Sequence, residues 1–229
     1  MRAFLLTAVL VCLAGATAWA QQLPAIDDHA KVVVENDQVR VLRYHYEPGD
    51  KSKMHSHPDN VQIVLTDSHA KVYTPDGKVA NSEGKAGEVR WRTAAAHSVE
   101  NVGDKAFEGI LVEMKVKPAG MAQELSAPDD HAKVVVENDQ VRVLRYRYEP
   151  GDKSKMHSHP DNVQIVLTDS HAKVYTPDGK VANSEGKAGE VRWRTAAAHS
   201  VENVGDKAFE GILVEMKTKP AGAKAATGE

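Results

Sequence analysis

The sequence predicts an all-β protein made of two tandem domains of the same fold. Three observations predict it: a long internal repeat, a regular succession of short β-branched and aromatic runs in each repeat, and no helical apolar stripe after residue 20. Strands of about 5–9 residues punctuated by Gly, Pro, Asn and Asp are typical of a β-sandwich or β-barrel. Repeat and strand pattern together indicate two separate β domains rather than one large sheet.

The repeat divides the chain into two nearly identical halves. Residues 27–120 recur at 129–222, an offset of 102, and only two positions differ: His45 corresponds to Arg147, and Val116 corresponds to Thr218. Each unit has roughly 100 residues, the usual size of one domain, whereas solenoid repeats are about 20–50 residues long. We infer a tandem duplication of a one-domain ancestor.

Composition shifts set the expected boundaries. The segment 119–128 contains Pro, Gly and small residues without periodicity, as a linker does, and the tail over 221–229 resembles a frayed end. We therefore expect one domain over 21–118 and a second over 129–220. The two domains would form a pseudo-dimer within one chain, and their remaining edge strands allow a further homodimer.

The first twenty residues predict a signal peptide that is not part of the fold. Arg2 precedes an apolar run over 3–16, and Ala18-Trp19-Ala20 fits the small-x-small pattern that a signal peptidase cuts. Cys12, the single cysteine, lies within this run, so the exported chain would have neither a disulfide nor a thiolate metal ligand. We expect a secreted protein, extracellular or periplasmic, with no membrane segment after cleavage.

The strands of the first repeat follow from its apolar runs. The segment 38–46 alternates, with Leu42, Tyr44 and Tyr46 on one face and Val39 and Val41 on the other. Because alternating aromatic residues usually pack inward, we expect core positions for most of Tyr44, Tyr46, Tyr73 and Trp91. The remaining expected strands are 30–35, 61–66, 69–74, 87–92, 97–102 and 107–115.

A cluster of histidines predicts a metal site in each repeat. In an extended strand, side chains two residues apart point to the same face, so His55 and His57 project together. Gln62 starts the next strand and can return to that face, and His97 opens another strand. The same spacing recurs in the second repeat, at His157, His159, Gln164 and His199.

These residues resemble the two motifs of the cupin family. The pattern Gly-x5-His-x-His-x4-Gln from Gly49, followed by His97-x3-Asn101, is similar to both motifs, and the resemblance spans most of each unit. It implies two jelly-roll β-barrels, with metal ligands at His55, His57 and His97 and at their repeats. The family usually has a glutamate ligand where this chain has Gln62 and Gln164. Two roles are therefore open for these glutamines: coordination of the metal as a fourth ligand, or hydrogen bonding beside it.

The donor set indicates one transition-metal ion per domain. Three neutral imidazoles, with or without an amide, bring no negative charge, which favours copper, nickel or zinc over iron or manganese. We favour copper, with zinc, iron and nickel as alternatives. The candidates for orienting the imidazoles are Arg90, Arg92, Glu100 and Asn101.

The other histidines are not expected to bind the metal or to take part in catalysis. His29 and its repeat His131 follow two aspartates and are interpreted as surface residues. His69 and His171 have no spaced partner, so surface or polar core positions are expected. His45 cannot be required for chemistry common to both repeats, because Arg147 replaces it, and drift is the favoured explanation for that pair.

Three functions remain open at this point. The first is a copper oxidoreductase using O₂ or H₂O₂, because a small secreted barrel of this kind resembles the copper cupin that cleaves cellulose oxidatively, which acts as a dimer of single cupins. The second is a small-molecule dioxygenase or lyase, and the third is a metal- or ligand-binding module without turnover. The net charge of −3 and the mixed charges give no nucleic-acid footprint.

Overall fold

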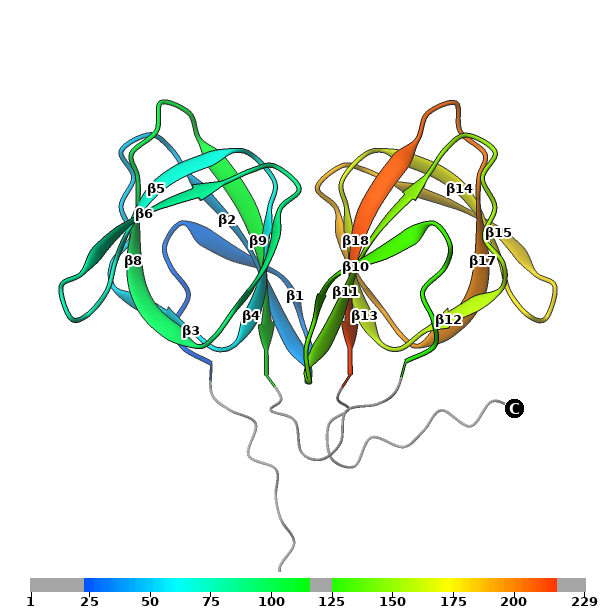
Figure 1. The fold of residues 1–229 in the computed structure, drawn as a ribbon, viewed down its shortest axis with the longest axis horizontal. Coiled ribbons are helices and arrows are strands. Elements are labelled where there is room, and N and C mark those ends of the chain that lie inside the picture. Colours follow the sequence, from blue (N-terminus) through cyan, green and yellow to red (C-terminus); the bar gives the residue numbers. More distant parts are fainter. Residues whose placement is uncertain (1–22, 116–124, 218–229) are drawn as a thin grey trace, which may run out of the picture.

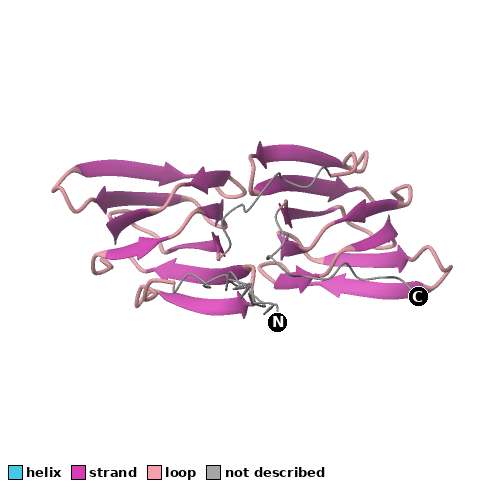
Figure 2. Cartoon of the chain, turned by 90° about the horizontal axis from the view of Figure 1, so that it is seen from below, coloured by secondary structure: helices cyan, strands magenta, loops and turns pink. Residues whose placement is uncertain are grey.

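The computed structural model describes residues 23–115 and 125–217 as strands and loops, without a helix (Figures 1 and 2). In these two ranges, no helix is long and apolar enough to cross a membrane. The expected signal peptide and most of the expected linker and tail lie outside the described residues.

Each repeat contributes nine strands. Those of the first repeat are β1 (Ala30–Glu35), β2 (Val39–Tyr46), β3 (His55–His57), β4 (Asn60–Val64), β5 (Ser68–Tyr73), β6 (Val79–Gly84), β7 (Val89–Arg92), β8 (Ala95–Asn101) and β9 (Phe107–Met114). Those of the second repeat are β10 (Ala132–Glu137), β11 (Val141–Tyr148), β12 (His157–His159), β13 (Asn162–Val166), β14 (Ser170–Tyr175), β15 (Val181–Gly186), β16 (Val191–Arg194), β17 (Ala197–Asn203) and β18 (Phe209–Met216).

The strands of each repeat form two antiparallel sheets. In the first repeat a five-stranded sheet has the order β1-β2-β9-β4-β7, and a four-stranded sheet has the order β3-β8-β5-β6. The second repeat has the same orders, β10-β11-β18-β13-β16 and β12-β17-β14-β15. The all-β prediction is therefore confirmed, and Figure 1 shows the two sheets of each repeat closing into a barrel.

One strand has no counterpart among the expected ones. β6 pairs with β5 across a turn in which Gly77 adopts a φ of 82°, a conformation that glycine tolerates without steric cost. No strand was expected between the segments 69–74 and 87–92. The sequence of β6 is polar and most of its residues are exposed, because β6 is an edge strand, so it lacks the apolar alternation that would predict it.

The largest apolar core lies between the two repeats rather than inside either barrel. On β2, Val39 and Val41 point away from the barrel interior and are fully buried, while Tyr44 and Tyr46 belong to a separate cluster inside the barrel, as the alternation predicts. The outward faces of both five-stranded sheets meet in one cluster, and Figure 1 shows these sheets side by side. Its fully buried members in the first repeat are Val39, Val41, Val61, Ile63, Ile110 and Val112.

Polar contacts cross the same interface in symmetric pairs. The Arg43 guanidinium donates to the carbonyl of Gly189 at 3.2 Å, and Arg145 donates to the carbonyl of Gly87 at 3.3 Å. Each arginine also binds a glutamate of its own repeat, which orients it toward the other barrel. The two repeats therefore pack as a pseudo-symmetric pair, in which each relies on the other to cover its outer sheet face.

Candidate metal centre

Two short strands bring the three histidines of each repeat together. β3 pairs antiparallel with β8 so that His55 lies directly opposite His97, and the alternation within β3 puts His57 on the same face. The ring centroids are 4.8 Å apart for His55 and His97, 4.9 Å for His55 and His57, and 5.3 Å for His57 and His97.

The second repeat reproduces this cluster with His157, His159 and His199. In each repeat one ligand atom from every histidine can be chosen so that all lie within 4.8 Å of one another. The predicted three-histidine face is thus present twice, once in each barrel.

Hydrogen bonds fix the orientation of two imidazoles. The Nδ1 of His55 lies 2.8 Å from the carbonyl oxygen of Lys53, and the Nδ1 of His57 lies 2.6 Å from Oε1 of Glu113. Since a carbonyl and a carboxylate can only accept, Nδ1 carries the proton and Nε2 keeps a free lone pair. This is the arrangement that metal-binding histidines show in proteins, with Nδ1 held by a carbonyl or carboxylate.

His97 remains a neutral donor without such a partner. Burial, with the neighbouring His55 and His57 as smaller causes, lowers its pKa to about 4. The same holds for His199 in the second repeat. Three neutral, converging imidazoles fit a transition-metal ion of the nitrogen-preferring kind, so the residues present suit the metal that the motifs imply.

Glu113 is the supporting residue that the sequence analysis missed. It is fully buried on β9, where its carboxylate also accepts a hydrogen bond from Nε of Arg40 at 2.6 Å. Burial alone would raise the pKa of Glu113, but the hydrogen bonds from His57 and Arg40 lower it below its ordinary value. The sequence does contain a signal for this residue. Alternation along the run 107–114 puts Glu113 on the same inward face as Phe107 and Leu111. A buried acid on that face is costly without a partner, so a partner for Glu113 could have been inferred.

The four residues expected to orient the imidazoles have other contacts. Arg90 binds Glu88, Asn101 donates to the carbonyls of Tyr46 and Lys105, and Glu100 forms an ion pair with Lys51. Among the hydrogen bonds of residues 23–115, none joins Arg90, Arg92, Glu100 or Asn101 to a triad imidazole. That expectation was wrong: Arg90 and Arg92 bond to Glu88 and Gln62, their repeats Arg192 and Arg194 lie across the cavity from the histidines, and Glu100 and Asn101 bond to other partners.

Gln62 lies in the barrel with both ends of its amide engaged. Its Nε2 donates to the hydroxyl of Tyr44 at 3.1 Å, and its Oε1 accepts from Nε of Arg92 at 3.2 Å. Gln164 repeats these contacts with Tyr146 and Arg194. The amide thereby links the buried tyrosine to the arginine, and coordination of the metal by Gln62 or Gln164 stays a prediction.

The remaining histidines lie outside the triads. His69 is exposed beside Glu83, in agreement with its surface interpretation. His29 is more enclosed than expected, since its ring stacks on Tyr46 with centroids 4.5 Å apart and its Nδ1 is 3.2 Å from Asp27.

The single difference between the equivalent stretches 27–115 and 129–217 lies on an outer strand face. His45 contacts Glu47 and Glu108, and Arg147 contacts the equivalent Glu149 and Glu210. The substitution therefore keeps both carboxylate partners, and it does not reach the metal triad.

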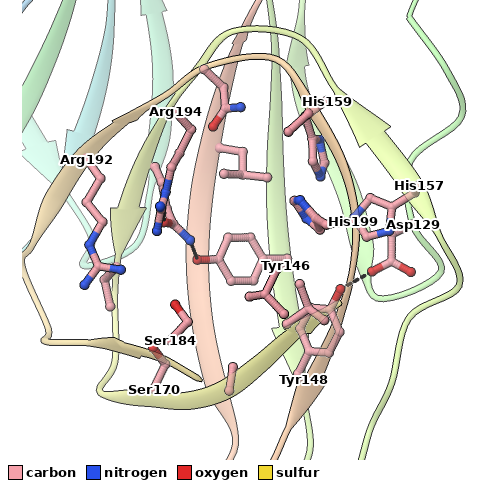
Figure 3. Close-up of a pocket in the computed structure, with 18 of the residues that line it drawn as sticks. Asp129, Tyr146, Tyr148, His157, His159, Ser170, Ser184, Arg192, Arg194 and His199 are labelled. Carbon is pink, nitrogen blue, oxygen red and sulfur yellow. Dashed lines mark hydrogen bonds between the residues drawn. The ribbon is translucent and has the colours of Figure 1, made fainter. Parts of the chain in front are cut away.

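The triad opens into a cavity. In the second barrel this cavity has a volume of about 570 Å³ and is lined by all three histidines together with Gln164, Arg194 and Asp129. Figure 3 shows the histidines on one side of the cavity and Arg192 and Arg194 on the other, with Asp129 beside the histidines and bonded to the hydroxyl of Tyr148.

The wall of this cavity carries two arginines but a single acid among the described residues. That acid is Asp129. Arg192 is neutralised by Glu190 at 2.5 Å, whereas Arg194 has no carboxylate within 4.0 Å in the described part of the chain. Burial lowers the pKa of Arg194, and the adjacent charge of Arg192 adds to this. Arg194 is therefore a cation without a counter-ion at the cavity wall.

Comparisons with known proteins support the fold. No family model and no curated protein matches the sequence. Among solved structures, oxalate decarboxylase of Bacillus subtilis, studied for its Mn(II) centres, matches with a TM-score of 0.56 at 12% identity over 87% of this chain and 78% of its own. The Lactobacillus farciminis oxalate decarboxylase in complex with formate matches with a TM-score of 0.57 at 14% identity, covering 86% of each chain.

A single cupin domain from Bordetella pertussis Tohama I is also similar, at 27% identity over 43% of this chain and 100% of its own, with a TM-score of 0.36. The likeness to the two-barrel decarboxylases shows that this chain has the fold of a bicupin, two cupin barrels in tandem. The predicted fold class is confirmed.

Proposed function

We propose that this bicupin is a metal-dependent enzyme that acts on a small anionic molecule inside its barrels. The observation that carries the proposal is the unpaired Arg194 on the wall of the cavity that also holds the histidine triad. A cavity of about 570 Å³ lies within the usual range of small-molecule sites, roughly 300–1,000 Å³. A carboxylate in this cavity would complement both a bound cation and the arginine.

The anchoring of Arg194 supports this role. Its Nε is held by Oε1 of Gln164 at 3.3 Å, and Gln164 is held in turn by the hydroxyl of Tyr146. This chain of contacts fixes the guanidinium at the wall while leaving its terminal nitrogens available. Arg92, Gln62 and Tyr44 repeat the arrangement in the first barrel. Arg92 and Arg194 would therefore bind and orient the anion.

The metal would be held by the three imidazoles of each barrel. When bound, it would supply Lewis-acid or redox chemistry beside the cavity. Asp129 is the one carboxylate on the wall that can accept a proton, and the hydroxyl of Tyr148 holds it in place. Gln164 cannot act as a base, because its amide does not titrate.

We also propose copper as the metal, because three neutral imidazoles without a carboxylate favour it. The Mn(II) centres of the structurally similar decarboxylase make Mn²⁺ the direct competitor in any test. Oxidative cleavage of cellulose rests on the resemblance in motif, domain size and expected secretion, and a cavity inside the barrel suits a small molecule better than a polymer chain. Export to the periplasm or the medium stays part of the proposal, and N-terminal sequencing of the secreted chain tests it.

The test measures metal content first and turnover second. The exported protein is purified without added metal, titrated with Cu²⁺, Mn²⁺ and Zn²⁺, and assayed against small mono- and dicarboxylates, including oxalate, and against cellulose with ascorbate. We expect turnover of a small carboxylate, and we expect the double variant Arg92→Ala/Arg194→Ala to raise KM at least about tenfold, since a charge-assisted hydrogen bond contributes about 1.5–3 kcal/mol.

The control is the double variant Lys78→Ala/Lys180→Ala, which removes from each repeat a positive charge that lies on the surface beside Asp76 or Asp178. It should leave KM unchanged. Turnover of cellulose alone, or carboxylate turnover that is indifferent to Arg92 and Arg194, would contradict the proposal. Tight metal binding without any turnover would favour a passive binding module.

A further inference from the structure

The two strands that carry the second triad are tied together at their ends by one aspartate. Asp161 lies in the loop after β12, two residues beyond the ligand His159. Its Oδ1 accepts a hydrogen bond at 2.8 Å from the backbone N–H of Ala196, three residues before the ligand His199. The Asp161 carboxylate therefore fixes the loop after one histidine strand against the loop before the other.

The second oxygen of this carboxylate is held from the other repeat. The side-chain amide of Gln38, in the first repeat, donates through Nε2 to Oδ2 of Asp161 at 2.7 Å. Gln38 is itself anchored, because its carbonyl accepts from the backbone N–H of Lys115, at the end of the strand that carries Glu113. With both oxygens engaged, the carboxylate is held in one orientation.

The arrangement is reciprocal. Gln140 of the second repeat donates to Oδ2 of Asp59 at 2.7 Å, and Oδ1 of Asp59 accepts from the backbone N–H of Ala94 at 2.8 Å. Asp59 lies two residues beyond His57, and Ala94 lies three residues before His97. Each triad is thus supported by a glutamine of the opposite barrel, although within 23–115 and 125–217 no hydrogen bond or ion pair joins that barrel to a triad histidine directly.

We propose that Gln38 and Gln140 are positioning residues for the metal site of the opposite repeat. Gln38 holds the second site through Asp161, and Gln140 holds the first site through Asp59. The inference rests on the proposed metal binding and goes beyond it: each barrel holds all three histidines of its own site but takes part of their support from the other barrel. The tandem arrangement then has a role at the sites as well as in the shared core.

The near-identity of the repeats makes the role testable against simple stabilisation. Gln38 and Gln140 occupy equivalent places in one symmetric interface, so any loss of interface stability is the same for both. A positioning role acts crosswise: a change at Gln38 affects the second site, and a change at Gln140 affects the first. Only the crossed pattern requires the contacts through Asp161 and Asp59.

The experiment uses full-length chains that keep one triad each. The double variant His55→Ala/His57→Ala retains the second site, and His157→Ala/His159→Ala retains the first. Gln38→Ala or Gln140→Ala is added to each of these chains. Cu²⁺ affinity is measured by calorimetric titration, and the nitrogen hyperfine pattern in the electron paramagnetic resonance spectrum of bound Cu²⁺ is the second readout. Mn²⁺ serves as the second probe.

In chains that keep the second site, we expect Gln38→Ala to weaken Cu²⁺ binding roughly 3- to 10-fold and to alter the hyperfine pattern. This is less than the 10- to 100-fold that loss of a direct partner of a ligand brings. Gln38→Glu should weaken binding further, because it places a second carboxylate against Asp161. Gln140→Ala should change this site less than twofold, and the order should reverse in chains that keep the first site.

Equal effects of Gln38→Ala and Gln140→Ala on one site, or no effect of either, would overturn the inference while leaving the metal assignment intact. If neither single-site chain binds Cu²⁺ or Mn²⁺, the metal assignment itself fails and the inference fails with it. The two failures are therefore distinguishable in one set of titrations.

Discussion

The carboxylate of Glu113 lies 2.6 Å from Nδ1 of His57 and has no exposure to solvent. The same carboxylate forms an ion pair with Arg40, so a buried acid, a buried cation and an imidazole of the histidine triad form one chain of contacts. Glu215, His159 and Arg142 repeat the chain in the second barrel. This carboxylate supports the imidazole from behind, whereas the usual cupin glutamate position holds an amide, Gln62.

Replacing the buried glutamate should weaken metal binding at one site only. Glu113→Gln removes the charge that fixes the His57 tautomer, and we expect a loss of about 10- to 100-fold in Cu²⁺ affinity at the first site. The second site serves as the internal control, and Glu215→Gln should show the opposite pattern. The measurement is a titration that resolves two affinities, with circular dichroism to verify folding, since Arg40 loses its counter-ion. Two equally weakened sites would contradict the local role.

Removing one triad should halve the metal content. The variant His157→Ala/His159→Ala is expected to bind one ion per chain, measured by elemental analysis, against two for the parent. Metal should also raise the thermal midpoint of the parent, because binding to the folded state alone adds about 2.7 kcal/mol at a free metal concentration of 100 Kd. Recovery of two ions from the variant would refute the ligand assignment.

The interface between the repeats should dominate stability. Ile63 is on the outer face of its barrel but is fully buried against the other repeat. Ile63→Ala should therefore lower the free energy of unfolding by about 2–5 kcal/mol, the range for large-to-small changes in a core. Urea unfolding measures this. Val79→Ala, at a position 52% exposed, is the control and should have little effect. A small effect at Ile63 would mean that the two barrels do not share a core in solution.

The Tyr46 hydroxyl should give the stability a specific pH dependence. Burial would raise the pKa of Asp27, but hydrogen bonds from Tyr46 and His29 lower it below its ordinary value. A lowered folded-state pKa contributes stability above the unfolded value, near 3.8, which is lost as pH falls through the folded value.

Tyr46→Phe should therefore destabilise the protein by about 1–3 kcal/mol at pH 7, since the buried carboxylate loses a partner. The difference from the parent should shrink below about pH 4, where the acid becomes protonated. Unfolding midpoints across pH 2–8 measure this. A difference that is constant with pH would show that Asp27 is not involved. The control is Tyr44→Phe, which removes a buried hydroxyl bonded to the amide of Gln62 and to no carboxylate among the described residues, so its effect should not vary with pH over this range.

The sequence by itself determined the repeat, the β class and the three histidines that come together in each barrel. Alternation is local, so it placed His55 beside His57 and separated Val39 and Val41 from Tyr44 and Tyr46 without any knowledge of the fold. The spacing of the cupin-like motifs then assigned His97 to the same site, and the register of β3 against β8 agrees. Because both repeats carry the same residues, one local pattern predicted both sites.

Tertiary structure alone decided the contacts between residues that are distant in sequence. Glu113 supports His57 across 56 positions, and Gln38 holds Asp161 across 123, so neither pair has a periodic signal. The apolar residues on the outward faces of the five-stranded sheets predict buried strand faces. Their pattern does not indicate that the opposite repeat is what covers them. Such contacts form only when whole sheets dock against each other. Docking is stabilised by many weak apolar contacts together, and these contacts are not encoded in any single stretch of sequence.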